Sequence, residues 1–285
     1  MVKKIFNVSI LSIILGAFLL TSCSNDFAGV VASNDLDERL ISKNDFPFLS
    51  RYADNSALEP VLPDTFKFII VTDTHMEDGD DFGLMGINEA VKKHNASFVI
   101  NLGDITQHGT AHDIDLFIKI ADSLDVPFYP VIGNHDFYFG NWPVWRDKIG
   151  STKYRIDIKD LSDKYHTTLL VLDTGNAFFG RKQLDWLEFE LKTAHKNVFV
   201  FTHAALFTTG IKMQQVTDTR ERARVASILK NKADIMFSGH SHQRAVNEAG
   251  NVRYITFEDF KSTGIYIIAH VKPTGVTYKF DKLKN

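Results

Sequence analysis

The chain has 285 residues, of which 24% are charged and 44% are apolar, and its formal net charge at pH 7 is −3. This composition excludes a disordered tail and a collagen, and the single cysteine excludes a disulfide scaffold. There is no basic footprint of the kind that marks nucleic-acid-binding proteins. The length allows one large domain or two small ones, which must be held together by their apolar cores alone.

Residues 1–22 have the pattern of a secretory signal peptide. Two lysines precede an apolar run at 5–20 that is too short for a membrane-spanning helix. The sequence Leu-Thr-Ser at 20–22, followed by Cys23, resembles the lipobox of bacterial lipoproteins. The resemblance implies cleavage before Cys23, acylation of its thiol and new amine, and anchoring to a membrane of the bacterial cell envelope. The alternative is an ordinary signal peptide with an incidental cysteine.

Residues 23–64 are rich in serine, asparagine and aspartate and show no sustained hydrophobic period. This composition predicts a tether, whose N-terminus is lipidated if the lipobox resemblance holds, with residues 46–49 as a segment that could dock on the domain. Residues 65–285 are expected to form one folded unit.

Apolar runs of strand length alternate with amphipathic segments in this unit. The expected strands lie at 66–72, 98–102, 128–132, 169–172, 198–202 and 235–238. Continuous runs rich in valine, isoleucine and phenylalanine indicate strands buried on both faces, and therefore an α/β layered fold. After residue 250, three consecutive strands at 253–257, 264–271 and 275–280 are expected to form an antiparallel meander.

Five of the expected strands run directly into polar clusters. The clusters are Asp73-Thr74-His75, Gly103-Asp104, Gly133-Asn134-His135-Asp136, His203 and Gly239-His240-Ser241-His242. In open α/β sheets, ligands bind outside the carboxyl ends of the strands, so these clusters are expected to converge on one crevice. A lone histidine is usually structural, but five such clusters in one chain predict a functional site.

The side chains in these clusters indicate which cofactor the site holds. Imidazoles, carboxylates and an amide oxygen, with no thiolate, suit Zn, Mn, Fe or Ni better than Ca or soft copper. Seven donors are too many for one open catalytic ion and suit two ions that share a bridging carboxylate. Two such ions can clamp the attacking and leaving oxygens of an in-line displacement at phosphorus.

The order of the motifs resembles that of the calcineurin-like metallophosphoesterase superfamily, over about residues 66–271. The resemblance implies a four-layer αββα sandwich of mixed sheets and two divalent metal ions, with Mn, Fe or Zn favoured. The first ion is implied to bind Asp73, His75, Asp104 and His242. The second ion is implied to bind Asp104, Asn134, His203 and His240, so that Asp104 bridges. His135 is implied to face the phosphate as general acid or charge stabiliser.

Several residues near the motifs leave alternatives open. Gln107 stands where protein-phosphatase relatives place an aspartate that orients the acid histidine, and an amide cannot stabilise a charged imidazole as a carboxylate does. Asp136 is expected to hold a turn, and Asp173 is expected to be structural. The aromatic residues at 137–145 either wall a substrate pocket or pack a connecting helix, and Arg244 either contacts phosphate or lies on the surface.

The expected function is that of a lipid-anchored, cell-envelope phosphoesterase with a small-molecule phosphoester substrate. It would hydrolyse phosphodiester or phosphomonoester bonds by a two-metal hydroxide attack. One alternative is strict phosphomonoesterase specificity, and another is a non-catalytic surface binding module that retains its metals. Substrate choice depends on loops and pocket shape, so the motifs do not decide between diester and monoester.

Overall fold

The computed structural model describes residues 36–41, 46–52, 56–77, 82–207, 209–210 and 214–283. The expected signal peptide and Cys23 lie outside these residues. Among the helices of the described part, none has the length and apolar character needed to cross a membrane.

The first sheet has five strands in the order β11-β10-β1-β2-β3. Its strands are β1 (Phe66–Val71), β2 (Val99–Asn101), β3 (Phe128–Pro130), β10 (Ile265–Lys272) and β11 (Gly275–Lys282). The first three are parallel, while β10 is antiparallel to both β1 and β11. The helices α4 (Phe82–His94) and α5 (Ala111–Ala121) connect the parallel strands. Parallel neighbours place the carboxyl ends of β1, β2 and β3 at the same edge of the sheet.

The second sheet has six strands in the order β4-β5-β6-β7-β9-β8. Its strands are β4 (Tyr154–Lys159), β5 (Tyr165–Val171), β6 (Asn197–Phe201), β7 (Ile235–Ser238), β8 (Ala245–Ala249) and β9 (Val252–Thr256). The four central strands are parallel, and β4 and β8 run antiparallel at the two edges. The helices α7 (Arg181–Glu190) and α8 (Thr219–Leu229) connect the central strands.

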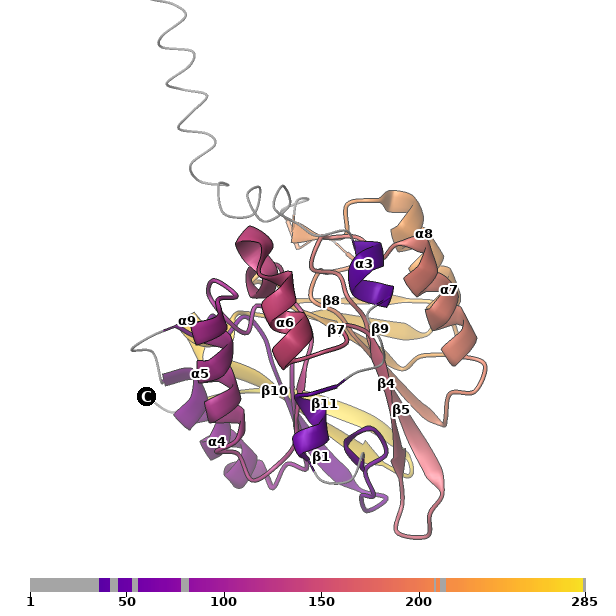
Figure 1. The fold of residues 1–285 in the computed structure, drawn as a ribbon. Helices are drawn as coiled ribbons and strands as arrows, with labels where there is room; N and C mark the ends of the chain where they lie inside the picture. The colour runs from indigo at the N-terminus through magenta and orange to yellow at the C-terminus, as the bar shows by residue number, and fades with distance from the viewer. Residues whose placement is uncertain are drawn as a thin grey trace, which may run out of the picture.

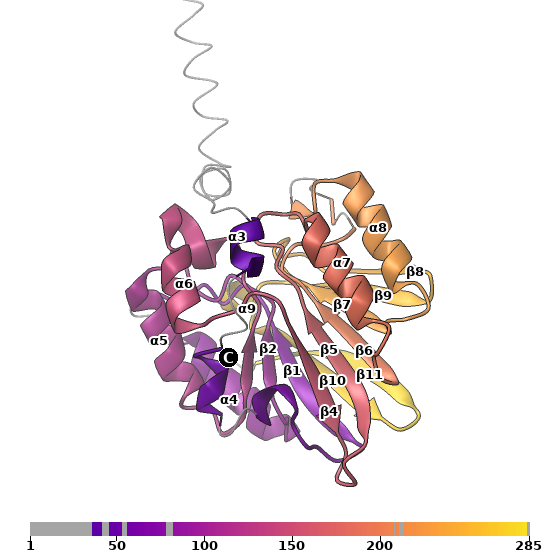
Figure 2. The ribbon, with the colours of Figure 1, turned by 45° about the vertical axis from the view of Figure 1, so that its right-hand side comes forward.

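Alternation along β6 shows how the two sheets and the helices form layers. The rings of Phe199 and Phe201 point to the first sheet, where their centroids lie 5.5 and 6.3 Å from that of Phe68. Val198 and Val200 point the other way, into a core shared with α7 and α8. Side chains of a strand alternate between faces, so β6 is buried on both. Figures 1 and 2 show the sheets between two helical layers, which confirms the predicted four-layer αββα sandwich.

The predicted meander after residue 250 is wrong. The strand β9 belongs to the second sheet, parallel to β7, and only β10 and β11 are antiparallel neighbours. Between β9 and β10, the carboxylate of Asp259 accepts the N–H of Ser262 and caps the short helix α9 (Phe260–Thr263). This helix carries the chain from one sheet to the other. Strand-length apolar runs indicate strands, but they do not specify which sheet each strand joins.

The N-terminal residues that the structure describes pack on this sandwich. They include α3 (Leu36–Ile41) and the 3-10 helices η1 (Leu49–Arg51) and η2 (Ser56–Leu58). The ring of Phe48 is 1% exposed and stacks on Phe117 of α5 at 5.0 Å. Docking of residues 46–49 is therefore confirmed, while the domain boundary at residue 65 stays a prediction.

Candidate metal centre

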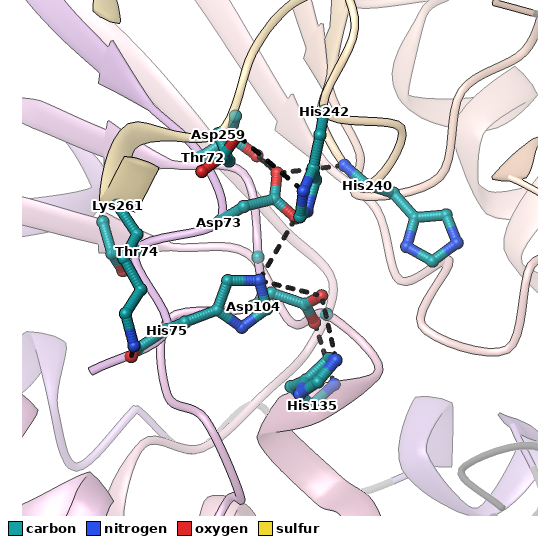
Figure 3. A network of polar contacts seen from close by, with 12 residues as sticks. Thr72, Asp73, Thr74, His75, Asp104, His135, His240, His242, Asp259 and Lys261 are labelled. Carbon is teal, nitrogen blue, oxygen red and sulfur yellow. Dashed lines mark hydrogen bonds and ion pairs between the residues drawn. The ribbon is translucent and has the colours of Figure 1, made fainter. Parts of the chain in front are cut away.

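The polar clusters follow the carboxyl ends of β1, β2, β3, β6 and β7, and the structure brings them together at one edge of the sandwich. The last of these strands leads into His240 and His242, and β3 leads through Asn134 into the 3-10 helix η3 (His135–Gly140), which α6 (Trp142–Lys148) follows. Figure 3 shows the side chains that meet there. The strands therefore place residues up to 169 positions apart in one site.

One group of donors lies around Asp73. Its Oδ1 atom lies 3.1 Å from His242 Nε2 and 3.9 Å from His75 Nε2. One ligand atom from each of these three residues lies within 4.8 Å of the others, which is close enough to hold a metal ion. This group is three of the four residues that were predicted for the first ion.

A second group lies around His203. Its Nε2 atom lies 3.3 Å from Asp104 Oδ2, 3.0 Å from Asn134 Oδ1 and 3.0 Å from His240 Nδ1. Four donors of different residues thus converge on one region, and they are the four that were predicted for the second ion. The side chains of His203 and Asp104 are 1% and 3% exposed, while His240 is half-buried.

The carboxylate of Asp104 lies between the two groups. Its Oδ2 atom is 3.3 Å from His203 Nε2 and 4.0 Å from the Nε2 atoms of both His75 and His135. Its Oδ1 atom accepts the backbone N–H of His135 at 2.8 Å. One carboxylate therefore faces both donor groups and the predicted acid histidine. Figure 3 shows its contacts with His75 and His135.

Buried opposite charges shift the pKa values of this site. Burial raises the pKa of Asp73, but its hydrogen bond to His242 and the charge of His203 outweigh this and hold it at about 2. Burial lowers the pKa of His203, but the charge of Asp104 and its hydrogen bond raise it to about 9. Asp73 is therefore ionised at neutral pH, which is the form that binds a metal ion, whereas His203 has to release a proton before its Nε2 atom can bind one.

Backbone carbonyls fix the orientation of two of the imidazole rings. The Nδ1 atom of His203 donates to the carbonyl oxygen of Leu102 at 2.9 Å, which leaves Nε2 facing Asp104. The Nδ1 atom of His135 donates to the carbonyl oxygen of Gln107 at 2.8 Å. A bond from the second ring nitrogen is the usual way in which metal-binding histidines are oriented. Gln107 thus holds His135 through its backbone carbonyl, and its side-chain amide takes no part in this hydrogen bond.

Five of the candidate ligands have a backbone in the left-handed region, which is costly for residues with a Cβ atom. Their φ angles are 53° at Asp73, 42° at His75, 49° at Asp104, 65° at His240 and 52° at His242. Hydrogen bonds between neighbouring loops hold this conformation, for example from the N–H of Asp73 to the carbonyl of Gly103 at 3.0 Å. Gly239 is required beside them, since a Cβ atom there would overlap Thr72 Oγ1. Such strain is typical of sites whose geometry serves a function.

The structure shows the contacts of two further residues near the motifs. Asp136 accepts the N–H groups of Thr106 and Gly133, so it holds a turn as predicted. Its burial and the charge of Asp104 raise its pKa to about 7. Arg244 pairs with a glutamate, with its Nε atom 3.1 Å from Glu258 Oε2, and lies over the ring of Phe280.

Two of the aromatic residues at 137–145 pack as one of the expected roles predicts, and a third contacts residues of the site. Trp142 and Trp145 are 1% and 0% exposed and belong to the hydrophobic core. Tyr138 instead touches the site, since its hydroxyl accepts a hydrogen bond from Asn134 Nδ2 at 2.7 Å and its ring centroid lies 4.3 Å from that of His135.

Sequence reasoning missed two threonines that support the site. The hydroxyl of Thr72 donates to Asp73 Oδ2 at 2.5 Å, and the hydroxyl of Thr174 accepts the N–H of His203 at 3.1 Å. Both threonines stand just beyond the end of a strand. Extending the strand-end criterion from metal donors to hydroxyl groups would have found them.

Comparison with known proteins agrees with this geometry. Residues 66–244 match the family described as calcineurin-like phosphoesterase. A probable glycerophosphodiester phosphodiesterase from Arcobacter nitrofigilis is 29% identical over 163 residues, which cover 53% of this chain and 58% of that relative. The chain thus matches less than two thirds of the relative's length.

Solved structures resemble the fold at lower sequence identity. A purple acid phosphatase from yellow lupin (Lupinus luteus) seeds gives a TM-score of 0.61 at 12% identity, over 78% of this chain and 52% of that one. A dimetal phosphatase from Danio rerio gives a TM-score of 0.58 at 15% identity, over 77% of this chain and 99% of that one. The family match covers residues 66–244, which are most of the folded part of the chain. This chain therefore belongs to the calcineurin-like phosphoesterase family of metal-dependent phosphoester hydrolases.

Proposed function

We propose that the protein hydrolyses phosphodiesters with two divalent metal ions, and that glycerophosphodiesters are its substrate class. The observation that carries the proposal is the position of Asp104, whose Oδ2 atom lies 3.3 Å from His203 and 4.0 Å from His75. A carboxylate between two donor groups suits a bridge between two ions. The name of the relative from Arcobacter nitrofigilis supports the substrate class.

The residues present fit two ions of the Mn, Fe or Zn type. The first ion would be held by Asp73, His75, Asp104 and His242, and the second by Asp104, Asn134, His203 and His240. These are nitrogen and oxygen donors without a thiolate, and the Nε2 atom of His75 lies 3.9 Å from Asp73 and 4.0 Å from Asp104. When bound, the ions supply Lewis-acid stabilisation of the phosphate charge and an activated water.

His135 is the residue proposed to move a proton. The carbonyl of Gln107 accepts a hydrogen bond from Nδ1–H, so the Nε2 atom faces the site, 4.0 Å from Asp104 Oδ2. In its imidazolium form His135 carries a second proton on Nε2. As water attacks phosphorus and the bond to the leaving oxygen breaks, Nε2 donates this proton to that oxygen, and the ring is left neutral with its other proton on Nδ1. The backbone N–H of the same residue donates to Asp104 Oδ1, which holds the main chain of His135 beside the donor groups.

Hydrolysis of two model substrates tests the proposal. The purified protein, loaded with Mn²⁺, is expected to cleave bis(p-nitrophenyl) phosphate faster than p-nitrophenyl phosphate, and to release glycerol phosphate from a glycerophosphodiester. Faster cleavage of the monoester would instead indicate a phosphatase. Two bound ions without turnover of either substrate would indicate a metal-retaining binding module and would refute the proposed activity.

We also propose that the protein is a lipoprotein of the bacterial cell envelope, anchored through Cys23. The support is the sequence alone, since a basic start, an apolar run and the only cysteine follow one another in the required order. Ser24 after the cysteine favours release to the outer membrane. This location would place the site within reach of phosphoesters outside the cytoplasm.

A further inference from the structure

A buried arginine of the N-terminal segment contacts a loop that supports the proposed metal centre. Arg39 of α3 is 0% exposed, and its guanidinium bonds both carboxylate oxygens of Asp173 at 2.8 and 2.9 Å. It also donates to Asn176 Oδ1 at 2.5 Å and lies 4.4 Å from the ring centre of Phe137. Arg39 is outside residues 66–244, which match the family.

The loop that Arg39 holds is in contact with a proposed metal ligand. This loop follows β5, and the hydroxyl of Thr174 in it accepts the backbone N–H groups of His203 at 3.1 Å and Ala204 at 2.8 Å. The two hydrogen bonds set the position of the turn that follows β6. Since Thr174 is the immediate neighbour of Asp173, a shift of that aspartate moves the support of His203.

The same guanidinium reaches the helix that carries the predicted acid. Phe137, which lies beneath Arg39, is two residues after His135 in η3. The loop after β5 also packs closely against Phe137, since a Cβ atom on Gly175 would lie only 2.5 Å from Phe137 Cε1. Arg39 therefore contacts two neighbouring elements, one that supports His203 and one that carries His135.

We propose that Arg39 is a positioning residue for the second metal ion, and that α3 belongs to the catalytic unit. The guanidinium acts through Asp173 and Thr174 on His203, and through Phe137 on η3. The planar guanidinium makes two parallel hydrogen bonds to the carboxylate of Asp173 while its face lies on the ring of Phe137. A lysine ammonium cannot make both contacts, so an arginine is needed here. The inference rests on the proposed two-ion site.

The competing explanation is that this ion pair merely stabilises the fold. Removing one partner of a buried pair leaves an uncompensated charge, so a lower melting temperature is expected in either case. Only a positioning role predicts a selective effect on one of the two ions. Metal binding, measured well below the melting temperature, therefore separates the two explanations.

The experiment uses the full protein with Arg39→Met and, as the milder change, Arg39→Lys. Mn²⁺ binding is followed by electron paramagnetic resonance of the free ion. In the wild type two ions are expected per chain. In the variants one ion should bind as in the wild type, and the other about 10- to 100-fold more weakly, as is usual when the support of a metal ligand is lost. The weakened ion should be the one that Asn134→Ala also weakens.

Phe48→Leu is the matched control, since Phe48 is a buried residue of the same N-terminal segment that packs on α5 away from the site. It should lower the melting temperature and leave both affinities unchanged. Unchanged affinities in folded Arg39→Lys, an equal loss of both ions, or the same loss in Phe48→Leu would overturn the inference. A wild type that fails to bind two ions would instead refute the proposed metal site.

Discussion

Replacing Asp104 by asparagine should remove the carboxylate ligand that the two proposed metal ions share. The amide has nearly the shape of the carboxylate but no charge. Its oxygen can still accept the N–H of His135, now made by Asp104 Oδ1 at 2.8 Å. The NH₂ group then takes the position of Oδ2, which faces His203 at 3.3 Å and His75 at 4.0 Å. An amide nitrogen in that position is a hydrogen-bond donor and cannot bind a cation.

The expected loss follows from the removed charge. A unit charge 4 Å from another, at an effective dielectric constant of about 20, contributes about 4 kcal/mol. At about 1.4 kcal/mol for each factor of ten, this corresponds to metal binding weaker by about 10³-fold, and an ion of charge +2 loses more. Because Asp104 is proposed to hold both ions, the hydrolysis of bis(p-nitrophenyl) phosphate should fall by at least the same factor.

Isothermal titration with Mn²⁺ and elemental analysis after dialysis measure the loss directly. The matched control is Asp113→Asn, a buried aspartate of the capping box at the start of α5, where an amide oxygen can still accept the N–H of Thr110. This control should keep two ions and wild-type activity. If Asp104→Asn also binds two ions with wild-type affinity, the bridging role of this carboxylate is refuted.

Three further substitutions test single parts of the proposal. His135→Ala should keep both ions and lower kcat by about 10²- to 10⁴-fold, most for poor leaving groups; loss of metal, or equal slowing of all esters, would contradict the acid role. Tyr138→Phe removes the hydroxyl that accepts from Asn134 and should weaken one ion about tenfold in Mn²⁺ titration, whereas unchanged affinity would contradict this support. Cys23→Ala should abolish lipid modification and membrane retention in fractionated cells, and a variant still in the membrane would exclude the anchor.

Local patterns along the chain were enough to predict a layered α/β fold and the edge at which the site lies, whereas the four-layer αββα arrangement was implied by the family resemblance. Continuous apolar runs predicted strands buried on both faces, and β6 shows why, since Phe199 faces the other sheet and Val200 faces the helices. Polar clusters directly after such runs predicted a common site, because parallel strands end at the same edge of a sheet. The assignment of each residue to an ion came from the family resemblance and stays a prediction.

Contacts between segments that are far apart in the chain became visible only in the folded molecule. The sequence did not show that β9 joins β7, because an apolar run of strand length can pair in either sheet. It did not show that Gln107 holds His135 through its backbone carbonyl, since every residue has one. Arg39 gave no signal at all in a segment expected to be a tether. Its burial depends on Asp173, 134 residues away, and such a pairing is fixed by packing and not by local pattern.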